Sequence, residues 1–179
     1  MGPMLKEESF HLGTGSNGLR RIIKAGVIPL DMLQRYINKW VSTAHDLFGV
    51  DASSSAHWAY VWGIKGRWDE RKKLDAGIEV NKEVLNEESR GHYHQEIVAE
   101  VRKLCGYLPE GAEELYVPHE NFNRAIGATK GQHFNVDGTP FEGSEEDYAA
   151  YLAEVLPTDQ DELDPVSYTH LRAHETYRD

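Results

Sequence analysis

The sequence predicts a mainly α-helical protein that carries one small β-hairpin. Two observations predict the helices: apolar residues recur every three or four positions in several segments, and glycine and proline stand where these segments begin and end. The dipeptide Asp137-Gly138, between two short extended segments, predicts the hairpin. With 179 residues and 40% apolar content, the chain is long enough for one domain but short for two.

The first expected helix covers residues 4–24. Its apolar residues fall close to a helical repeat: Leu5, Leu12, Leu19, Ile22 and Ile23. Residues 13–18 match the pattern G-x-G-x-x-G, which marks a dinucleotide-binding turn where a strand precedes a helix. Because the residues before it are polar and helical in pattern, we reject nucleotide binding. The glycines are better explained as points where another helix or a ligand approaches closely.

Glu8 and His11 stand three residues apart in this helix, on neighbouring parts of one face. Both side chains can therefore reach one metal ion. In ferritin-like di-iron and di-manganese bundles, two helices each supply such a Glu-x-x-His pair and two others each supply a lone carboxylate. The alternative is a solvated helical turn in which the two side chains merely neighbour each other.

Gly26 and Pro29 separate the first helix from a second over residues 30–48. One apolar stripe follows the second helix: Leu30, Leu33, Ile37, Trp40, Val41, Ala44 and Leu47. Residues 51–55 then offer N-caps for an aromatic-rich helix over residues 56–62. Such dense aromatic residues indicate core packing, with the wall of a planar-ligand pocket as the alternative.

Lys65 and Arg67 form a basic spot beside the aromatic segment. They could hold phosphate groups of an acyl carrier such as coenzyme A through charge-assisted hydrogen bonds. The alternative is that they pair with the neighbouring Asp69 and Glu70.

Residues 74–107 are charged and mostly helical in pattern, and they contain a second group of metal-binding residue types. His92 and His94 would point about 200° apart on a helix, so they cannot share an ion. Only the pairs that His92 makes with Glu88 or with Glu96 lie on a common face. The geometry therefore argues against a metal site in this segment.

The remaining sequence alternates short elements. Residues 115–117 suggest a short strand, residues 118–127 a short helix closed by glycine, and residues 132–136 and 139–142 the two arms of the hairpin. Ser144 is the expected N-cap of a last helix that runs to about residue 156, with carboxylates favourably placed in its first turn.

Charge and apolar content exclude several classes of protein. A formal net charge of −11 argues against non-specific binding of nucleic acid, which needs a positive field. The single Cys105 cannot form an internal disulfide and is most simply a small buried residue. Because no apolar run approaches the roughly 20 residues of a membrane helix and no secretory signal is apparent, we expect a cytoplasmic protein without membrane association.

Residues 165–179 differ in character from the rest. They resemble a translated sequencing-adapter read-through, so we treat them as a non-native tail and assign no function to them. His170 and His174, which have the spacing of a helical metal pair, are set aside for this reason.

Five sequence blocks occur in a recognisable order. They are residues 4–11 (MLKEESFH), 25–30 with 33–36 (AGVIPL and LQRY), 46–49 (DLFG), 63–70 (GIKGRWDE), and 117–119 with 122–127 (VPH and FNRAIG). Together they resemble the C-terminal part of the oxygenase component of benzoyl-CoA 2,3-epoxidase. The resemblance extends from about residue 4 to residue 156 and is weakest between residues 71 and 114.

This resemblance implies the end of a ferritin-like bundle in residues 1–50 and a helical extension with the hairpin in residues 51–164. It implies that Glu8 and His11 are the last Glu-x-x-His ligand pair of a di-iron centre. In the related enzymes, iron activates dioxygen and one oxygen atom is added across the aromatic ring of a CoA thioester. A separate NADPH-dependent flavin and iron–sulfur reductase supplies the electrons.

The chain departs from the family in two ways. Phe10-His11 stands where two adjacent histidines are expected, and the other ligands would lie upstream of Met1. Two ligands do not assemble a di-iron centre, so we expect the isolated chain to be inactive and its full-length parent to be the enzyme. The alternatives are a related phenylacetyl-CoA epoxidase-like subunit and a non-catalytic helical interaction subunit.

Overall fold

The computed structural model describes residues 2–49 and 54–161. The predicted tail and most of the predicted N-caps at residues 51–55 lie outside this part of the chain. Six α-helices form within the described residues: α1 (Gly2–Ala25), α2 (Leu30–Asp46), α3 (Ser54–Val61), α4 (Glu70–Asp75), α5 (Lys82–Cys105) and α6 (Glu145–Val155). The mainly α prediction is confirmed, and a ferritin-like helical bundle is compatible with this architecture.

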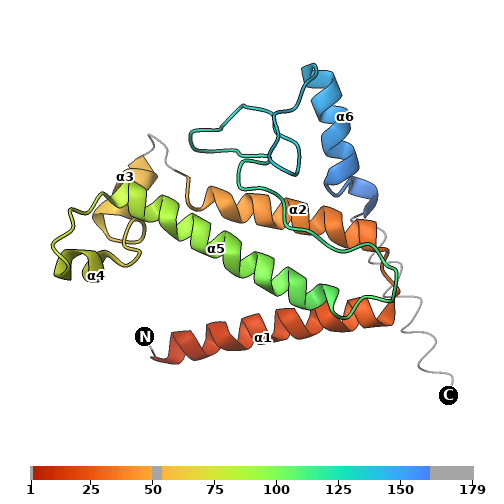
Figure 1. Ribbon diagram of the computed structural model, residues 1–179, viewed down its shortest axis with the longest axis horizontal. Coiled ribbons are helices and arrows are strands. Elements are labelled where there is room, and N and C mark those ends of the chain that lie inside the picture. Colours follow the sequence, from red (N-terminus) through yellow and green to blue (C-terminus); the bar gives the residue numbers. More distant parts are fainter. Residues whose placement is uncertain (1, 50–53, 162–179) are drawn as a thin grey trace.

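The three long helices α1, α2 and α5 make up the body of the molecule (Figure 1). α1 contacts α5, and α6 packs on α2. Figure 1 shows that α1 and α5 meet near their C-terminal ends and diverge toward their N-terminal ends. The short helices α3 and α4 lie together at the opposite end of the body from this meeting point.

The core lies where α1, α2 and α5 converge. Its buried members come from each of these helices and from the following loop: Ile23, Leu33, Val101 and Leu115. Cys105 is partly buried and packs against this cluster, with its Sγ 3.4 Å from the carbonyl oxygen of Leu115. None of the described helices is both long enough and apolar enough to cross a bilayer.

The glycine-rich segment of residues 13–18 lies inside α1 rather than in a strand-to-helix turn. This agrees with our rejection of a dinucleotide-binding turn. A Cβ atom added at Gly13, Gly15 or Gly18 would have no atom of another described element within 4 Å. The close approach that we expected at these glycines is therefore not made by any described element.

Two short elements expected between residues 115 and 127 are wrong. Residues 115–117 form no strand, because the side-chain amide of Gln34 takes up the backbone groups of Tyr116: it accepts from the Tyr116 N–H at 2.9 Å and donates to the Tyr116 carbonyl at 2.9 Å. Residues 118–127 form turns instead of a helix. The carboxylate of Asp46 accepts the backbone N–H groups of Ala125 and Ile126, and Asn123 has a φ of 48°.

The predicted hairpin is reduced to one antiparallel bridge, between Phe134 and Pro140, with no strand on either side. Its turn contains three residues rather than two. The N–H of Asn135 donates to Thr139 across the turn, and Gly138, with a φ of 87°, donates to Asn135. A two-residue type I′ turn requires positive φ at Asp137 as well, which the structure does not show. The last helix is confirmed, since Ser144 and Asp147 form a capping box at the start of α6.

Candidate functional site

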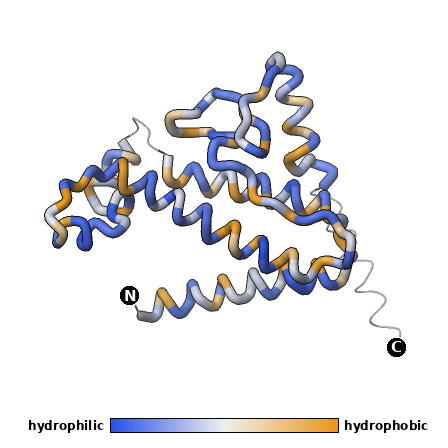
Figure 2. The backbone as a smooth tube through the Cα atoms, in the orientation of Figure 1, coloured by the Kyte–Doolittle hydropathy of each residue, from blue (hydrophilic) through white to orange (hydrophobic). Residues whose placement is uncertain are grey.

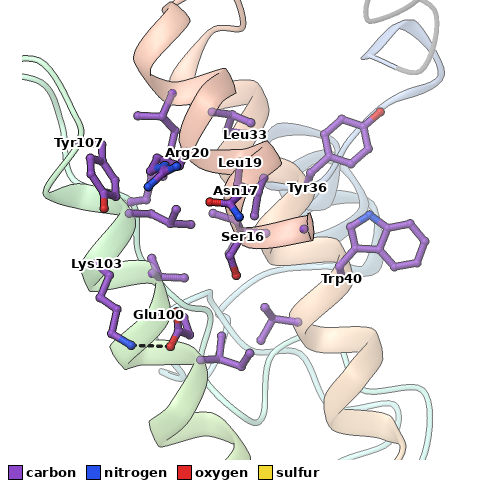
Figure 3. A pocket seen from close by; sticks show the side chains of 18 of the residues that line it. Ser16, Asn17, Leu19, Arg20, Leu33, Tyr36, Trp40, Glu100, Lys103 and Tyr107 are labelled. Atoms are coloured by element: carbon purple, nitrogen blue, oxygen red, sulfur yellow. Dashed lines mark hydrogen bonds and ion pairs between the residues drawn. The ribbon is translucent and has the colours of Figure 1, made fainter. Parts of the chain in front are cut away.

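A cavity of about 620 Å³ lies between α1, α2 and α5 (Figure 3). Its walls are mainly apolar: Leu12, Leu19 and Ile23 from α1, Leu33, Ile37, Trp40 and Val41 from α2, and Ile97, Val101 and Leu104 from α5. Polar side chains stand among them: His11, Ser16, Asn17, Arg20, Tyr36, Glu100, Lys103 and Tyr107. Both the volume and the apolar lining are typical of sites for small organic molecules.

The divergence of α1 from α5 produces this cavity. The apolar stripe of α1 is buried at Ile23 but is 40% exposed at Leu19 and 68% exposed at Leu12. Hydrophobic residues recur along the whole of α1 (Figure 2), including the part that no other described element covers. The stripe therefore forms a core contact at one end of α1 and an open apolar wall toward the other.

Glu8 and His11 lie at the open end of the cavity. Their Oε2 and Nδ1 atoms are 3.8 Å apart, and the side chains are 70% and 61% exposed. His11 lines the cavity, and Glu8 lies one turn before it on α1. The structure thus brings the predicted pair together beside an apolar space.

The donor set at this pair is small. Within residues 2–49 and 54–161, no group of three or more His, Cys, Asp or Glu side chains is placed to hold a metal ion. Glu8 and His11 have the chemistry and the spacing to share one ion, but a di-iron centre requires several further carboxylates and a second histidine. The described part of the chain therefore does not form that centre by itself.

Lys65 and Arg67 have partners outside the cavity. Lys65 Nζ donates to the carbonyl oxygen of Gly49 at 3.0 Å, and Arg67 Nε donates to Glu70 at 2.6 Å. Asp69 instead pairs with Lys72, at 2.8 Å. The alternative of local pairing thus describes Arg67 correctly, and neither cation lines the cavity. Their predicted role in substrate binding stays a prediction.

The histidines of α5 have separate neighbours, as their spacing predicted. The ring of His92 lies on Trp68, with ring centroids 4.8 Å apart, while Glu88 pairs with Lys73. His94 points to α2, where its Nδ1 atom is 3.4 Å from Nε2 of His45. His92 and His94 therefore do not share a site.

The pair formed by His45 and His94 was not anticipated. His45 is fully buried, and its burial lowers its pKa to about 4, with further contributions from His94 and from the guanidinium groups of Arg124 and Arg90. Burial also lowers the pKa of His94. Because Arg124 and Arg90 disfavour added positive charge, we interpret His45 and His94 as an uncharged pair that connects α2 with α5. One sequence signal could have identified it: His45 falls one turn after Val41, in line with the apolar stripe.

The chain is similar in sequence to a known oxygenase component. No protein-family model matches the chain. The chain is similar to benzoyl-CoA oxygenase component B of Aromatoleum evansii, with 30% identity over 202 aligned residues that include 89% of this chain and 42% of that protein. This finding confirms the resemblance indicated by the five sequence blocks. The chain spans less than half the length of the curated relative that it matches.

Proposed function

We propose that this chain is part of an oxygenase that acts on an aromatic CoA thioester such as benzoyl-CoA. In the proposed reaction, one atom of dioxygen adds across the aromatic ring as an epoxide. The other atom leaves as water after reduction by electrons from an NADPH-dependent flavin and iron–sulfur reductase. The similarity to benzoyl-CoA oxygenase component B over 89% of the chain is the observation that carries this proposal.

Glu8 and His11 are the proposed iron ligands in this chain. Iron bound there, together with a second ion, would supply the activation of dioxygen. The chain's own residues would orient the substrate, since the cavity that His11 lines offers an aromatic ring an apolar surface from three helices. An apolar wall also limits access of bulk water to the ring.

The remaining ligands would come from a part of the parent protein that this chain does not contain. The exposed stripe of α1 supports this arrangement, because Leu5 and Leu12, which are 65% and 68% exposed, lie on the same side of the helix as Glu8. Additional bundle helices would cover that stripe while placing their carboxylates near Glu8. We propose accordingly that residues 1–50 supply bundle helices, residues 51–164 form an extension, and the isolated chain is inactive.

A chimera tests this proposal. The chain replaces the matching 42% of the Aromatoleum evansii protein, and the product is assayed for bound iron and for oxidation of benzoyl-CoA with the reductase. We expect iron and activity in the chimera, and loss of both in Glu8→Gln and His11→Gln variants. Glu110→Gln is the matched control, because Glu110 is an exposed loop residue that does not line the cavity.

The outcomes separate the competing functions. Full iron content in the Glu8→Gln and His11→Gln chimeras would refute the ligand assignment. Faster oxidation of phenylacetyl-CoA than of benzoyl-CoA would favour the related epoxidase. A folded chimera with neither iron nor activity would favour a non-catalytic helical subunit.

A further inference from the structure

We propose that the cavity between α1, α2 and α5 binds an amphipathic organic anion lengthwise. Its anionic group would lie at Arg20 and Lys24, beside Tyr107, and its apolar group would lie between the helices toward His11. The position and direction of the ligand are inferred from the cavity itself, and only its natural identity as an aryl-CoA thioester rests on the proposed function.

Two cations converge on one aromatic ring at the edge of the cavity. Lys24 Nζ lies 4.8 Å and Arg20 Cζ 5.9 Å from the centroid of Tyr107. Among the described residues, neither cation forms an ion pair with a carboxylate, whereas Lys103 on the facing wall is paired with Glu100 at 2.6 Å. A cation that lies over a ring keeps N–H groups free to bind an anion. This end of the cavity therefore has positive charge that is not neutralised, in a chain with a net charge of −11.

The other end of the cavity is marked by His11. Arg20 and His11 both line the cavity and are nine residues apart on α1, which at 1.5 Å per residue places them about 13–14 Å apart along the helix. The walls between them are apolar and come from all three helices, through residues such as Leu19, Ile37 and Ile97. Figure 3 shows Arg20 beside Tyr107, across the cavity from Trp40.

These dimensions select a class of ligand. A small anion such as benzoate is too short to reach both ends, and an uncharged aromatic compound would leave the cations unused. A thioester that joins an aromatic ring to a phosphorylated carrier through a long flexible arm satisfies both requirements. Arg20 lines the cavity, and Lys24 lies over the ring of Tyr107, which also lines it, whereas Lys65 and Arg67 have partners away from the cavity.

Calorimetric titration of the complete metal-free chain at low salt tests the inference. The ligands are benzoyl-CoA, CoA and benzoate. The variants are Arg20→Gln/Lys24→Gln, the matched pair Lys65→Gln/Arg67→Gln, and Leu19→Trp, which narrows the cavity at a partly exposed position and leaves both cations in place.

We expect benzoyl-CoA to bind more tightly than CoA or benzoate. The Arg20→Gln/Lys24→Gln variant should weaken its binding roughly tenfold, as expected for two partly solvated charge-assisted contacts. The Lys65→Gln/Arg67→Gln variant should change binding by less than about twofold, because the affected pairs lie outside the cavity. Leu19→Trp should weaken benzoyl-CoA binding, because the larger side chain fills part of the space between the two ends of the cavity.

Three results would overturn the inference: no binding of benzoyl-CoA, no effect of Arg20→Gln/Lys24→Gln, or an equal loss in Lys65→Gln/Arg67→Gln. These results are distinct from failure of the proposed function. A chimera that oxidises benzoyl-CoA despite Arg20→Gln/Lys24→Gln, with unchanged KM, would retain the function and remove this binding mode. Normal benzoyl-CoA binding to a chimera that holds no iron would retain this binding mode and remove the proposed function.

Discussion

The helices α1 and α2 both carry an apolar stripe, yet the chain surrounds one and leaves the other open. α2 buries six residues, of which Asn38, Ser42 and His45 are polar, whereas α1 buries only Ile23 among its described side chains. The stripe alone therefore does not decide burial. What distinguishes α2 is a set of polar contacts to segments that are distant in sequence.

These contacts fix the segments after residue 115 to α2. Asn38 donates to the carbonyl oxygen of Val155 at 2.8 Å and accepts from Gln34, also at 2.8 Å. Asp46 accepts from Arg124 Nε at 2.7 Å. Such bonds are directional, so they determine which residues cover α2 as well as how firmly they do so. No comparable anchor reaches the first half of α1 within the described chain, where Ser9 bonds only to the carbonyl oxygen of Leu5.

The largest effect should come from breaking the anchor at the end of α2. Arg124→Gln removes the guanidinium group that pairs with Asp46, and the Arg124 side chain is only 1% exposed. We expect a loss of about 3–5 kcal/mol in the free energy of unfolding, because a partly buried carboxylate is left without its counter-charge. Urea unfolding measures it, with Lys103→Gln in an exposed pair as the control. A loss below 1 kcal/mol would show that Asp46 is not the anchor.

Acid should weaken the α2 side of the molecule next. The pKa of His45 is about 4 in the folded chain and 6.5 in an unfolded one, so the unfolded state binds more protons between these values. The contribution of neutral His45 to the free energy of unfolding should be fully present above pH 6.5. It should fall by up to about 3 kcal/mol as the pH drops to 4. Lowering of the pKa of His94 acts in the same direction.

Unfolding measured at several pH values gives this slope. In a His45→Gln variant the slope between pH 6.5 and 4 should be clearly smaller, whatever its overall stability. An equal slope would mean that other groups cause the acid sensitivity.

A methyl group at Gly138, in the turn of residues 136–138, should also be costly. Gly138 has a φ of 87°, and an added Cβ would collide with the ring of His119. For Gly138→Ala we expect a loss of about 1–3 kcal/mol, from backbone strain together with displacement of His119. Thermal unfolding checks this value, and unchanged stability would show that the turn relaxes freely.

The same change in α1 should have the opposite sign and the smallest size. At Gly15 the helix is regular, and an added Cβ meets no atom within 4 Å. Gly15→Ala should therefore stabilise α1 by up to about 1 kcal/mol through helix propensity alone. Slower amide exchange in α1 would confirm it. Destabilisation would contradict this expectation, because it would mean that another part of the chain contacts Gly15 closely.

Sequence patterns predicted the features that depend on neighbouring residues. The long helices, the end of α1 at Gly26 and the Ser144 capping box all follow from local spacing, and the structure shows each of them. The pairing of Glu8 with His11 also follows, because three residues on a helix fix their separation.

Features that depend on distant residues could not be predicted. Residues 115–127 have strand and helix patterns, but Gln34 and Asp46 from α2 bind their backbone groups and hold them in other conformations. The cavity depends on the angle between α1 and α5, which no local pattern determines. The cluster of Arg20, Lys24 and Tyr107 needs the same long-range arrangement.

The contact between Gln34 and Tyr116 has a consequence for how this family can diverge. At residue 116 the Gln34 amide binds main-chain groups alone, the N–H and the C=O, and every amino acid except proline provides both. Evolution can therefore exchange the side chain at position 116 without losing this attachment. At position 34, only an amide of the same length supplies both a donor and an acceptor at that reach. Among homologues, glutamine at position 34 should thus persist where position 116 varies, so that the invariant residue lies on α2 and the loop it holds is free to change.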